Sequence, residues 1–196
     1  MKRAVKLSIY AVAIAGLSIA NVHVVRADRA SGADEGQSAE ATEANPVWWK
    51  NYHWDRSPLY TYIQGGSSNI EAIRAINDWT GRTDIQMRST TSHRDISVLR
   101  GNYGLTGWLG LAEIKSAARD PHCSNGYCEI RHCHASLNTS YSRSSWRRQG
   151  TYCMELGHCF GLAHDLDNGC MNSGAMNAGT SNVASARNVA AINGRY

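Results

Sequence analysis

One short stretch near the C-terminal end of the chain carries the residues best suited to chemistry. It reads Met154-Glu155-Leu156-Gly157-His158, and it continues through Gly161 to His164. An α-helix turns by about 100° per residue, so positions 154, 155 and 158 share one face. Gly161 can adopt the left-handed conformation that ends a helix, which would turn the chain back and bring His164 toward His158. Two imidazoles beside a carboxylate are suited to holding a zinc ion and to hydrolysis.

Glu155 and Met154 set the chemistry that this arrangement can perform. Glu155 is expected to act as a general base, taking a proton from water and passing it to a leaving amine. Met154 lies one helical turn before His158 on the same face, so a metal bound there would also meet its side chain. Its thioether is neutral and soft, which fits copper(I) better than zinc. The residues therefore predict an incomplete set of zinc ligands.

The extended pattern E-x-x-H-x-x-G-x-x-H, followed by Cys170-Met171, resembles that of the metzincin zinc proteases, where another histidine precedes the glutamate. Three further segments occur in the order expected of that clan: Asp95-Ile96-Ser97-Val98, Tyr103-Gly104-Leu105-Thr106-Gly107-Trp108-Leu109-Gly110-Leu111-Ala112 and Leu137-Asn138-Thr139. The likeness is to a secreted bacterial, matrixin-like branch and covers roughly residues 54–196. The resemblance implies that His158 and His164 ligate Zn²⁺, that Glu155 is the general base and that Met171 forms the Met-turn beneath the metal.

The resemblance also implies an α+β fold with a twisted, mostly parallel sheet and two long helices, the active-site helix being followed by the Met-turn and a C-terminal helix. The residues themselves predict strands over 58–63, 85–88, 95–100, 107–114 and 127–138. Ser68 and Glu71 have the spacing of a capping box, and the isoleucines that follow at helical intervals predict a core-facing helix. Ser144 or Ser145 should cap the active-site helix, expected over 146–161, and a closing helix is expected over 181–192.

Three residues are candidates to add a metal ligand or to support one. His132 and His134 alternate along a predicted strand, so they share one face and either could reach a metal or line the substrate cleft. Solvent-facing or hydrogen-bonded histidines are the alternative. Asp165 directly follows His164, and its alternative role is to open the turn over residues 165–169.

Six cysteines in an exported chain predict disulfides, and six allow 15 complete pairings. Cys123 and Cys128 flank an Asn-Gly turn and could close a hairpin. Cys153 and Cys170 would then bridge, fastening the Met-turn to the metal helix, as the resemblance also implies. The remaining pair is Cys133–Cys159, unless Cys159 is a free thiolate near the metal.

The N-terminal residues predict export. Basic residues precede an apolar run over 7–20, and small residues suit cleavage after Ala27, so residues 1–27 are predicted to be a signal peptide. Residues 28–45 are small and acidic and predict a disordered leader, and residues 46–196 a single catalytic domain. Four of the 20 basic residues leave with the signal peptide, so 16 basic and 16 acidic residues remain. This balance argues against nucleic-acid binding.

Two functions follow from these observations. The first is a secreted, extracellular zinc endopeptidase, a monomer without a stable membrane anchor that acts on peptides or proteins. The alternative is a catalytically inactive, peptide-binding protein of the metzincin fold, in which Met154 marks lost metal chemistry. Retention of Glu155 favours the enzyme, because a carboxylate facing a cleft without a metal carries an electrostatic cost.

Overall fold

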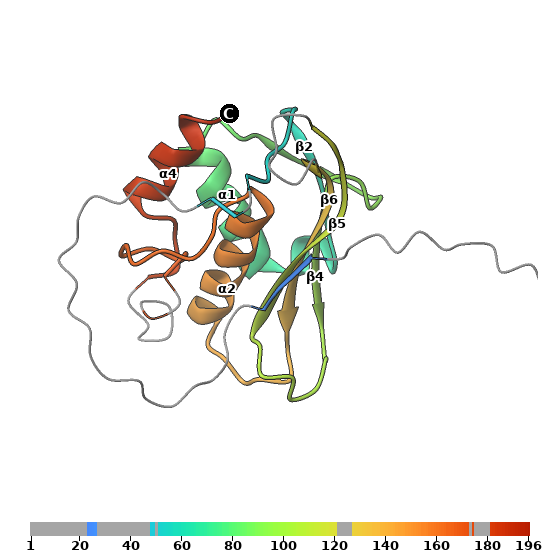
Figure 1. The fold of residues 1–196 in the computed structure, drawn as a ribbon. Helices are drawn as coiled ribbons and strands as arrows, with labels where there is room; N and C mark the ends of the chain where they lie inside the picture. The colour runs from blue at the N-terminus through green and yellow to red at the C-terminus, as the bar shows by residue number, and fades with distance from the viewer. Residues whose placement is uncertain (1–22, 27–47, 50, 121–126, 173, 175–180) are drawn as a thin grey trace, which may run out of the picture.

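The computed structural model describes residues 23–26, 48–49, 51–120, 127–172, 174 and 181–196. Within them the chain is α+β, as predicted, with the described helices gathered on one side of a single mixed sheet (Figure 1). The strands are β1 (His23–Arg26), β2 (Leu59–Ile63), β3 (Met87–Thr90), β4 (Ile96–Gly101), β5 (Gly110–Arg119) and β6 (Tyr127–Asn138). The α-helices are α1 (Ile70–Arg82), α2 (Ser145–Cys159) and α4 (Ala186–Asn193), and a short 3-10 helix precedes α1 at Gly66–Ser68.

The sheet has the strand order β1-β5-β6-β4-β2-β3. Pairing is parallel from β6 through β4 and β2 to β3, whereas β5 runs antiparallel to β6 and β1 runs antiparallel to β5. The sheet is therefore parallel from β6 to β3 and antiparallel at the edge formed by β5 and β1. β5 begins at residue 110 rather than 107, because the three preceding residues belong to a loop that Asn138 braces with hydrogen bonds to Gly104 and Trp108.

The start of α1 differs from the predicted capping box. Asn69 is the N-cap and makes no side-chain cap hydrogen bond, while Ser68 lies in the 3-10 helix and donates its hydroxyl to the Gly65 carbonyl. Glu71 instead accepts two hydrogen bonds from Arg148 in α2, at 2.6 and 3.0 Å. This ion pair fastens the beginning of α1 to the beginning of α2.

The core face of α1 also differs from the predicted isoleucine face. Ile70 is 44 % exposed, whereas Ala72, Ala75 and Trp79 are completely buried against the rest of the core. Small alanines let α1 approach α2 closely, and the Trp79 indole donates to the Cys153 carbonyl at 3.0 Å. The prediction holds for Ile76, which is buried in the core, and fails for Ile70. Helical spacing alone does not show which of several apolar positions faces the sheet and helix beside it.

α2 is the central helix, and all its residues from Gly150 to Cys159 are buried. Ser144 caps it as predicted, accepting a hydrogen bond from the Arg147 backbone. Two predicted disulfides hold it in place: Cys133–Cys159 joins its last residue to β6, and Cys153–Cys170 joins its middle to the turn that follows. The Cys133–Cys159 disulfide excludes the alternative of a free thiolate at Cys159.

The remaining predictions about termini and cysteines fall partly beyond the described residues. Cys123, residues 1–22 and the leader over residues 28–45 lie outside them, so the signal peptide and the leader stay predictions. Residues 23–26, placed by the sequence within the signal peptide, form β1 on the edge of β5. No helix in the described part of the chain has the length and apolarity to cross a membrane.

Candidate metal centre

The turn after α2 brings His164 back toward His158, as the sequence predicted. Gly161 has φ +91°, a left-handed conformation that L side chains rarely adopt. A Cβ at this position would also lie only 1.9 Å from the carbonyl oxygen of Tyr52. Glycine is thus required twice, once for the backbone conformation and once for the close approach of the N-terminal segment. The result is a pair of rings whose centroids lie 4.7 Å apart.

His158 is a neutral imidazole, and only one of its two ring nitrogens has a hydrogen-bond partner among the described residues. Its Nδ1 lies 2.8 Å from the Leu162 carbonyl oxygen, so Nδ1 carries the proton and donates it. Burial, together with the neighbouring His164, lowers the pKa of His158 to about 3 despite that hydrogen bond. The other nitrogen, Nε2, is buried and has no hydrogen-bond partner within the described part of the chain. An oriented, buried imidazole lone pair is the form in which histidine binds metal ions.

Glu155 lies one turn before His158 and is fully buried. Its carboxylate lies directly against the first residue of β5, because a Cβ built on Gly110 would be 2.3 Å from Glu155 Oε1. The same Cβ would lie 2.5 Å from Thr151 Cγ2, so helix and strand approach closely only because residue 110 has no side chain. Sequence analysis did not identify Gly110 as a residue of the site. It lies 45 positions before Glu155, and only the packing of α2 on β5 brings them together.

Met154 is fully buried, and among the described residues it is not part of the main hydrophobic core cluster, which includes its neighbours Cys153 and Leu156. Met171 does belong to the core and lies beneath α2, where a Cβ on Gly157 would be 2.2 Å from its sulfur. The two methionines therefore occupy different environments, one under the helix and one on the face that carries His158.

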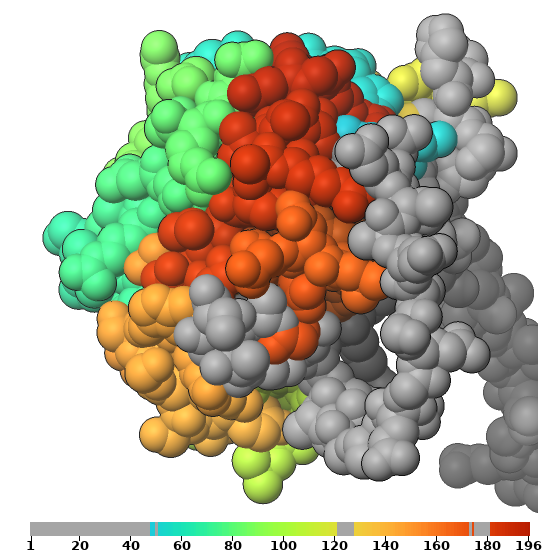
Figure 2. Space-filling view, turned by 90° about the vertical axis from the view of Figure 1, so that its left-hand side faces the viewer, coloured from blue at the N-terminus to red at the C-terminus, as the bar shows by residue number. Residues whose placement is uncertain are grey.

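Asp165 is engaged in the turn after His164. Its carboxylate accepts hydrogen bonds from the Asn188 side chain in α4 and from the Asp167 backbone, and its own backbone donates to the Met171 carbonyl. Both carboxylate oxygens thus hold the turn and tie it to α4. In Figure 2 the C-terminal segment, in red, lies beside this orange turn. The contacts favour the predicted role of opening the turn over that of an added ligand.

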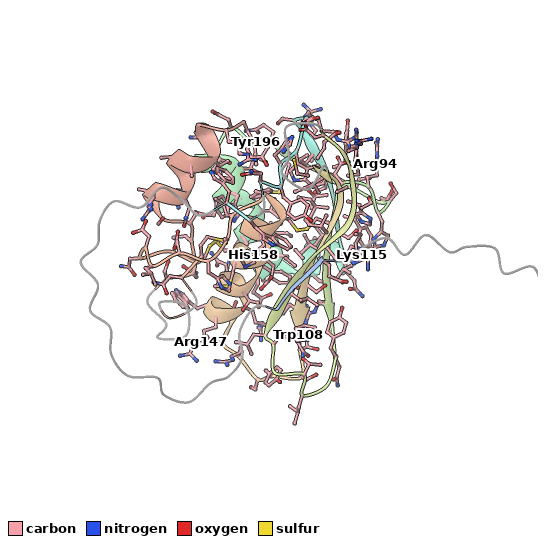
Figure 3. All side chains as sticks on the ribbon, in the orientation of Figure 1. Arg94, Trp108, Lys115, Arg147, His158 and Tyr196 are labelled. Atoms are coloured by element: carbon pink, nitrogen blue, oxygen red, sulfur yellow. A yellow bond between two sulfur atoms is a disulfide. The ribbon has the colours of Figure 1, made fainter. Side chains whose placement is uncertain are left out.

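His132 and His134 lie on the face of the sheet opposite to α2. Cys133 between them is bridged to Cys159 in α2, and side chains alternate along a strand, so both histidines must point the other way. In Figure 3, Lys115 likewise lies across the sheet from His158. Neither histidine is placed to complete the His158–His164 pair, which corrects the expectation that either could join it. The alternation was predicted, but the disulfide decides which face the histidines take.

On that outer face the two rings form a group of their own. Their centroids lie 4.8 Å apart, and His132 Nε2 lies 3.1 Å from the Ser97 hydroxyl, which also contacts His93 Nδ1 at 2.7 Å. Burial, followed by the charges of His132 and Lys115, lowers the pKa of His134 to about 4. The histidines are therefore neutral, hydrogen-bonded side chains of the outer sheet face.

The N-terminal segment of the domain supports the metal centre, a role that no sequence motif indicated. Trp48 forms an antiparallel β-bridge with Leu162, the residue whose carbonyl holds His158. The Trp49 backbone donates to the Gly161 carbonyl at 2.7 Å, and its indole lies edge-on to the His158 ring with centroids 6.4 Å apart. The turn between the two histidines is thus clamped from outside as well as from α2.

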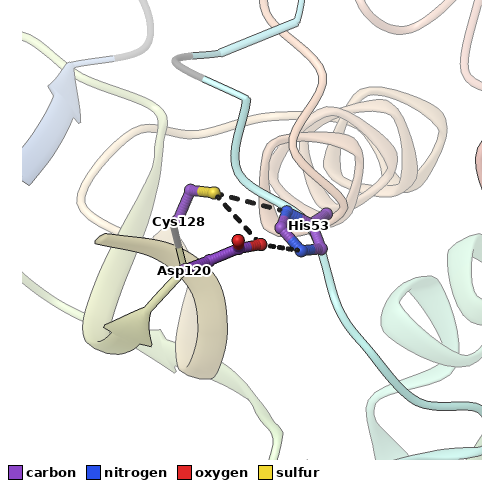
Figure 4. Close-up of side chains that lie close together, drawn as sticks. All are labelled: His53, Asp120 and Cys128. Atoms are coloured by element: carbon purple, nitrogen blue, oxygen red, sulfur yellow. Dashed lines mark hydrogen bonds and ion pairs between the residues drawn. The ribbon is translucent and has the colours of Figure 1, made fainter. Parts of the chain in front are cut away.

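A second group of titratable residues lies at the start of β6 (Figure 4). His53 Nε2 is 2.9 Å from Asp55 Oδ1 and 3.2 Å from Asp120 Oδ2, and His53 Nδ1 is 3.5 Å from Cys128 Sγ. His53, Asp120 and Cys128 are close enough together to suggest a metal site. Cys128, however, is disulfide-bonded, so it offers no thiolate to a metal. The group is better described as an ion-pair cluster that fastens the N-terminal segment to β5 and β6.

The residues of the centre fit a zinc ion in two positions out of three. His158 and His164 offer imidazoles, which are the commonest zinc ligands besides cysteine. The buried Nε2 of His158 has no hydrogen-bond partner among the described residues, so its lone pair could bind a metal ion. Met154 stands where a third imidazole would be, and its thioether is a poor zinc ligand. Zinc binding at this centre is therefore expected to be weaker than at a site of three histidines.

Comparisons with known proteins add little to the geometry. No family model matches the chain, and a search of curated proteins finds no match. Among solved structures, the chain is similar to high choriolytic enzyme 1, a hatching enzyme zinc-protease from the medaka fish Oryzias latipes, with a TM-score of 0.35 and 16 % identity. The match covers 61 % of this chain and 55 % of the other, so the chain spans about half the length of that protein.

Proposed function

We propose that the chain is a secreted zinc-dependent endopeptidase, with His158 and His164 as zinc ligands and Glu155 as general base. The observation that carries the proposal is the state of His158. Its Nδ1 is fixed on the Leu162 carbonyl, its Nε2 is buried without a hydrogen-bond partner in the described residues, and a second imidazole lies 4.7 Å away. An apolar core residue would gain nothing from such an arrangement, whereas a metal ligand requires it.

The residues around His158 and His164 would each have a separate role in hydrolysis. Zinc, held by the two imidazoles, would supply Lewis acidity that polarises a peptide carbonyl and makes water more acidic. Glu155 accepts the proton of the attacking water and delivers it to the leaving amine. Its burial against Gly110 keeps the carboxylate in one position. Met171 and the Cys153–Cys170 disulfide hold the helix and turn in register beneath the metal.

The edge of β5 is the proposed docking position for the peptide. β1 pairs antiparallel along it, with His23 opposite Ile114 and Arg26 opposite Leu111. This pairing supports the view that the edge accepts an extended chain through backbone hydrogen bonds. The same strand begins at Gly110, beside Glu155, so a peptide on this edge would run toward the general base. Removal of residues 1–27 on export would vacate the edge for a substrate.

The decisive experiment measures zinc content and peptidase activity on the same preparations of the mature chain. We expect about one zinc per chain and an activity that a chelator abolishes and zinc restores. Glu155→Gln should remove activity and keep both the metal and the thermal stability, because the amide is nearly isosteric but cannot accept the proton.

A matched control is Glu113→Gln, which makes the same change on β5 at a partly exposed residue that pairs with Lys115. It should leave activity within a few-fold of the original. Absence of bound zinc after incubation with excess zinc salt would refute the metal centre altogether. Full zinc occupancy with no cleavage of any peptide library would instead favour the alternative, a peptide-binding protein without catalysis.

A further inference from the structure

Met154 and His158 face the same space. They are four residues apart within the continuous helix α2, so their side chains are neighbours on one helical face. Both are buried, with 0 and 1 % of their surface exposed. The core cluster formed by the described residues includes Cys153 and Leu156 but not Met154. Helical spacing therefore places the Met154 thioether beside His158.

The three side chains form a donor set of two imidazoles and one thioether. None of them is a thiolate or a carboxylate, the anionic ligands that zinc often takes beside imidazole.

Donor softness favours copper(I). Thioether sulfur is polarisable and prefers copper(I), while zinc prefers imidazole, thiolate or carboxylate. Copper(I) is also compatible with imidazole ligands, so His158 and His164 suit both metals. Met154 is then the residue that distinguishes between the two ions, and its thioether favours copper(I) over zinc.

We propose that Met154, His158 and His164 form a copper(I)-selective site, so that copper(I) displaces zinc and switches the peptidase off. The ion enters and leaves as copper(I), and no electron is transferred. Copper(I) is a weaker Lewis acid than a divalent ion, so hydrolysis stops while it is bound. The inhibition rests on the proposed peptidase function; the selectivity for copper(I) rests only on the donor set.

The test is a competition titration of the mature chain under anaerobic conditions, with copper(I) supplied as its complex with a chromophoric chelator. Ascorbate keeps the copper reduced without opening disulfides, which matters because new thiolates would bind copper(I) themselves. Zinc affinity is measured separately with a zinc chelator. We expect one copper(I) per chain, bound more tightly than zinc, and a sulfur neighbour of copper in the X-ray absorption spectrum.

The informative variant is Met154→Leu, which keeps the volume of the side chain and removes the sulfur. Loss of a direct ligand should weaken copper(I) binding at least as much as loss of a group that orients a ligand, which costs about 10- to 100-fold. Zinc affinity should change by less than about threefold, because the thioether contributes little to it. Met154→His should reverse the preference by raising zinc affinity.

Two controls address other places where copper could bind. Met87→Leu makes the same substitution in β3, and it should leave copper(I) affinity unchanged. His132→Ala reports any copper held on the outer face of the sheet, and it should also have no effect. Copper(I) binding that survives Met154→Leu at full strength, or a spectrum without a sulfur neighbour, would overturn the proposal.

The outcomes also separate this inference from the proposed function. A chain that binds zinc and cleaves peptides but shows no preference for copper(I) would refute the copper site and leave the peptidase intact. A chain that binds copper(I) through Met154 but never cleaves a peptide would do the reverse. A chain that binds neither ion would refute both.

Discussion

Gly161→Ala is the substitution whose effect the structure defines most sharply. Residue 161 has φ +91°, and placing an L side chain in the left-handed region costs about 1–2 kcal/mol. The new Cβ would lie 1.9 Å from the Tyr52 carbonyl oxygen, where an ordinary contact needs about 3.4 Å, so backbone must move. Overpacking of this kind costs about 1–3 kcal/mol. The free energy of unfolding should fall by about 2–5 kcal/mol in all.

Gly107→Ala is the matched control. Gly107 has φ +83°, close to that of Gly161, but a Cβ there would meet nothing within 4 Å. It therefore carries the backbone cost without the clash, and both variants share the same loss of freedom in the unfolded chain. For a domain of this size, 1 kcal/mol shifts the melting temperature by about 2–4 °C. Gly161→Ala should consequently melt about 4–20 °C lower than the original chain, and Gly107→Ala only about 2–8 °C lower.

The assay is thermal unfolding of the metal-free chain, followed by a zinc titration of each variant at a temperature where it is folded. Displacement of the turn at residue 161 moves His164 away from His158, so Gly161→Ala should also lose zinc affinity, while Gly107→Ala should retain it. Equal melting temperatures for the two variants would refute the reasoning about the Tyr52 carbonyl. Unchanged zinc affinity in Gly161→Ala would refute the claim that this turn positions His164.

Two further outcomes are expected. Gly110→Ala would place a Cβ 2.3 Å from Glu155 Oε1, and a carboxylate displaced by about 1 Å should lower kcat/KM by about 100-fold with zinc content unchanged; Gly81→Ala, in open space on α1, is its control. The pKa of His134 is about 4 in the folded chain and about 6.5 in the unfolded chain. Between these pH values the unfolded chain binds more protons than the folded chain. The free energy of unfolding therefore decreases as the pH falls from 6.5 to 4. His134 is half-buried, so solvent screening reduces this loss to about 1–2 kcal/mol. His134→Gln should flatten a denaturation series over that range, and an unaltered slope would contradict the shift.

Features that depend on neighbours in the chain were predicted well. The helix with Glu155 and His158, its Ser144 cap and the left-handed Gly161 follow from spacing and backbone preference within about 20 residues. Predictions from local sequence were wrong where a residue distant in the chain offered a competing interaction. Glu71 left its predicted cap for Arg148, 77 residues away, because an ion pair with two hydrogen bonds outweighed a single bond to the helix end.

The functional interpretation shows the same division between local and distant contacts. The alternation of His132 and His134 was readable from the strand, but the side of the sheet on which they lie was not. The bridge from Cys133 to Cys159 sets it, and with it excludes both histidines from the metal centre. Gly110 could not be identified from the sequence for a related reason. A glycine in a strand can be there for several reasons, and only the close approach of α2 shows that residue 110 must lack a side chain.

The sequence by itself determined the donors, namely two imidazoles, one carboxylate and a thioether at the intervals of one helix and its closing turn. The tertiary structure alone decided which of the chain's other histidines and carboxylates stay apart from them, and how Trp48 and Trp49 clamp the turn. The physical reason is that helical spacing and glycine conformations depend on a few consecutive residues. Faces and close approaches depend on strand order and packing, which join residues more than 100 positions apart.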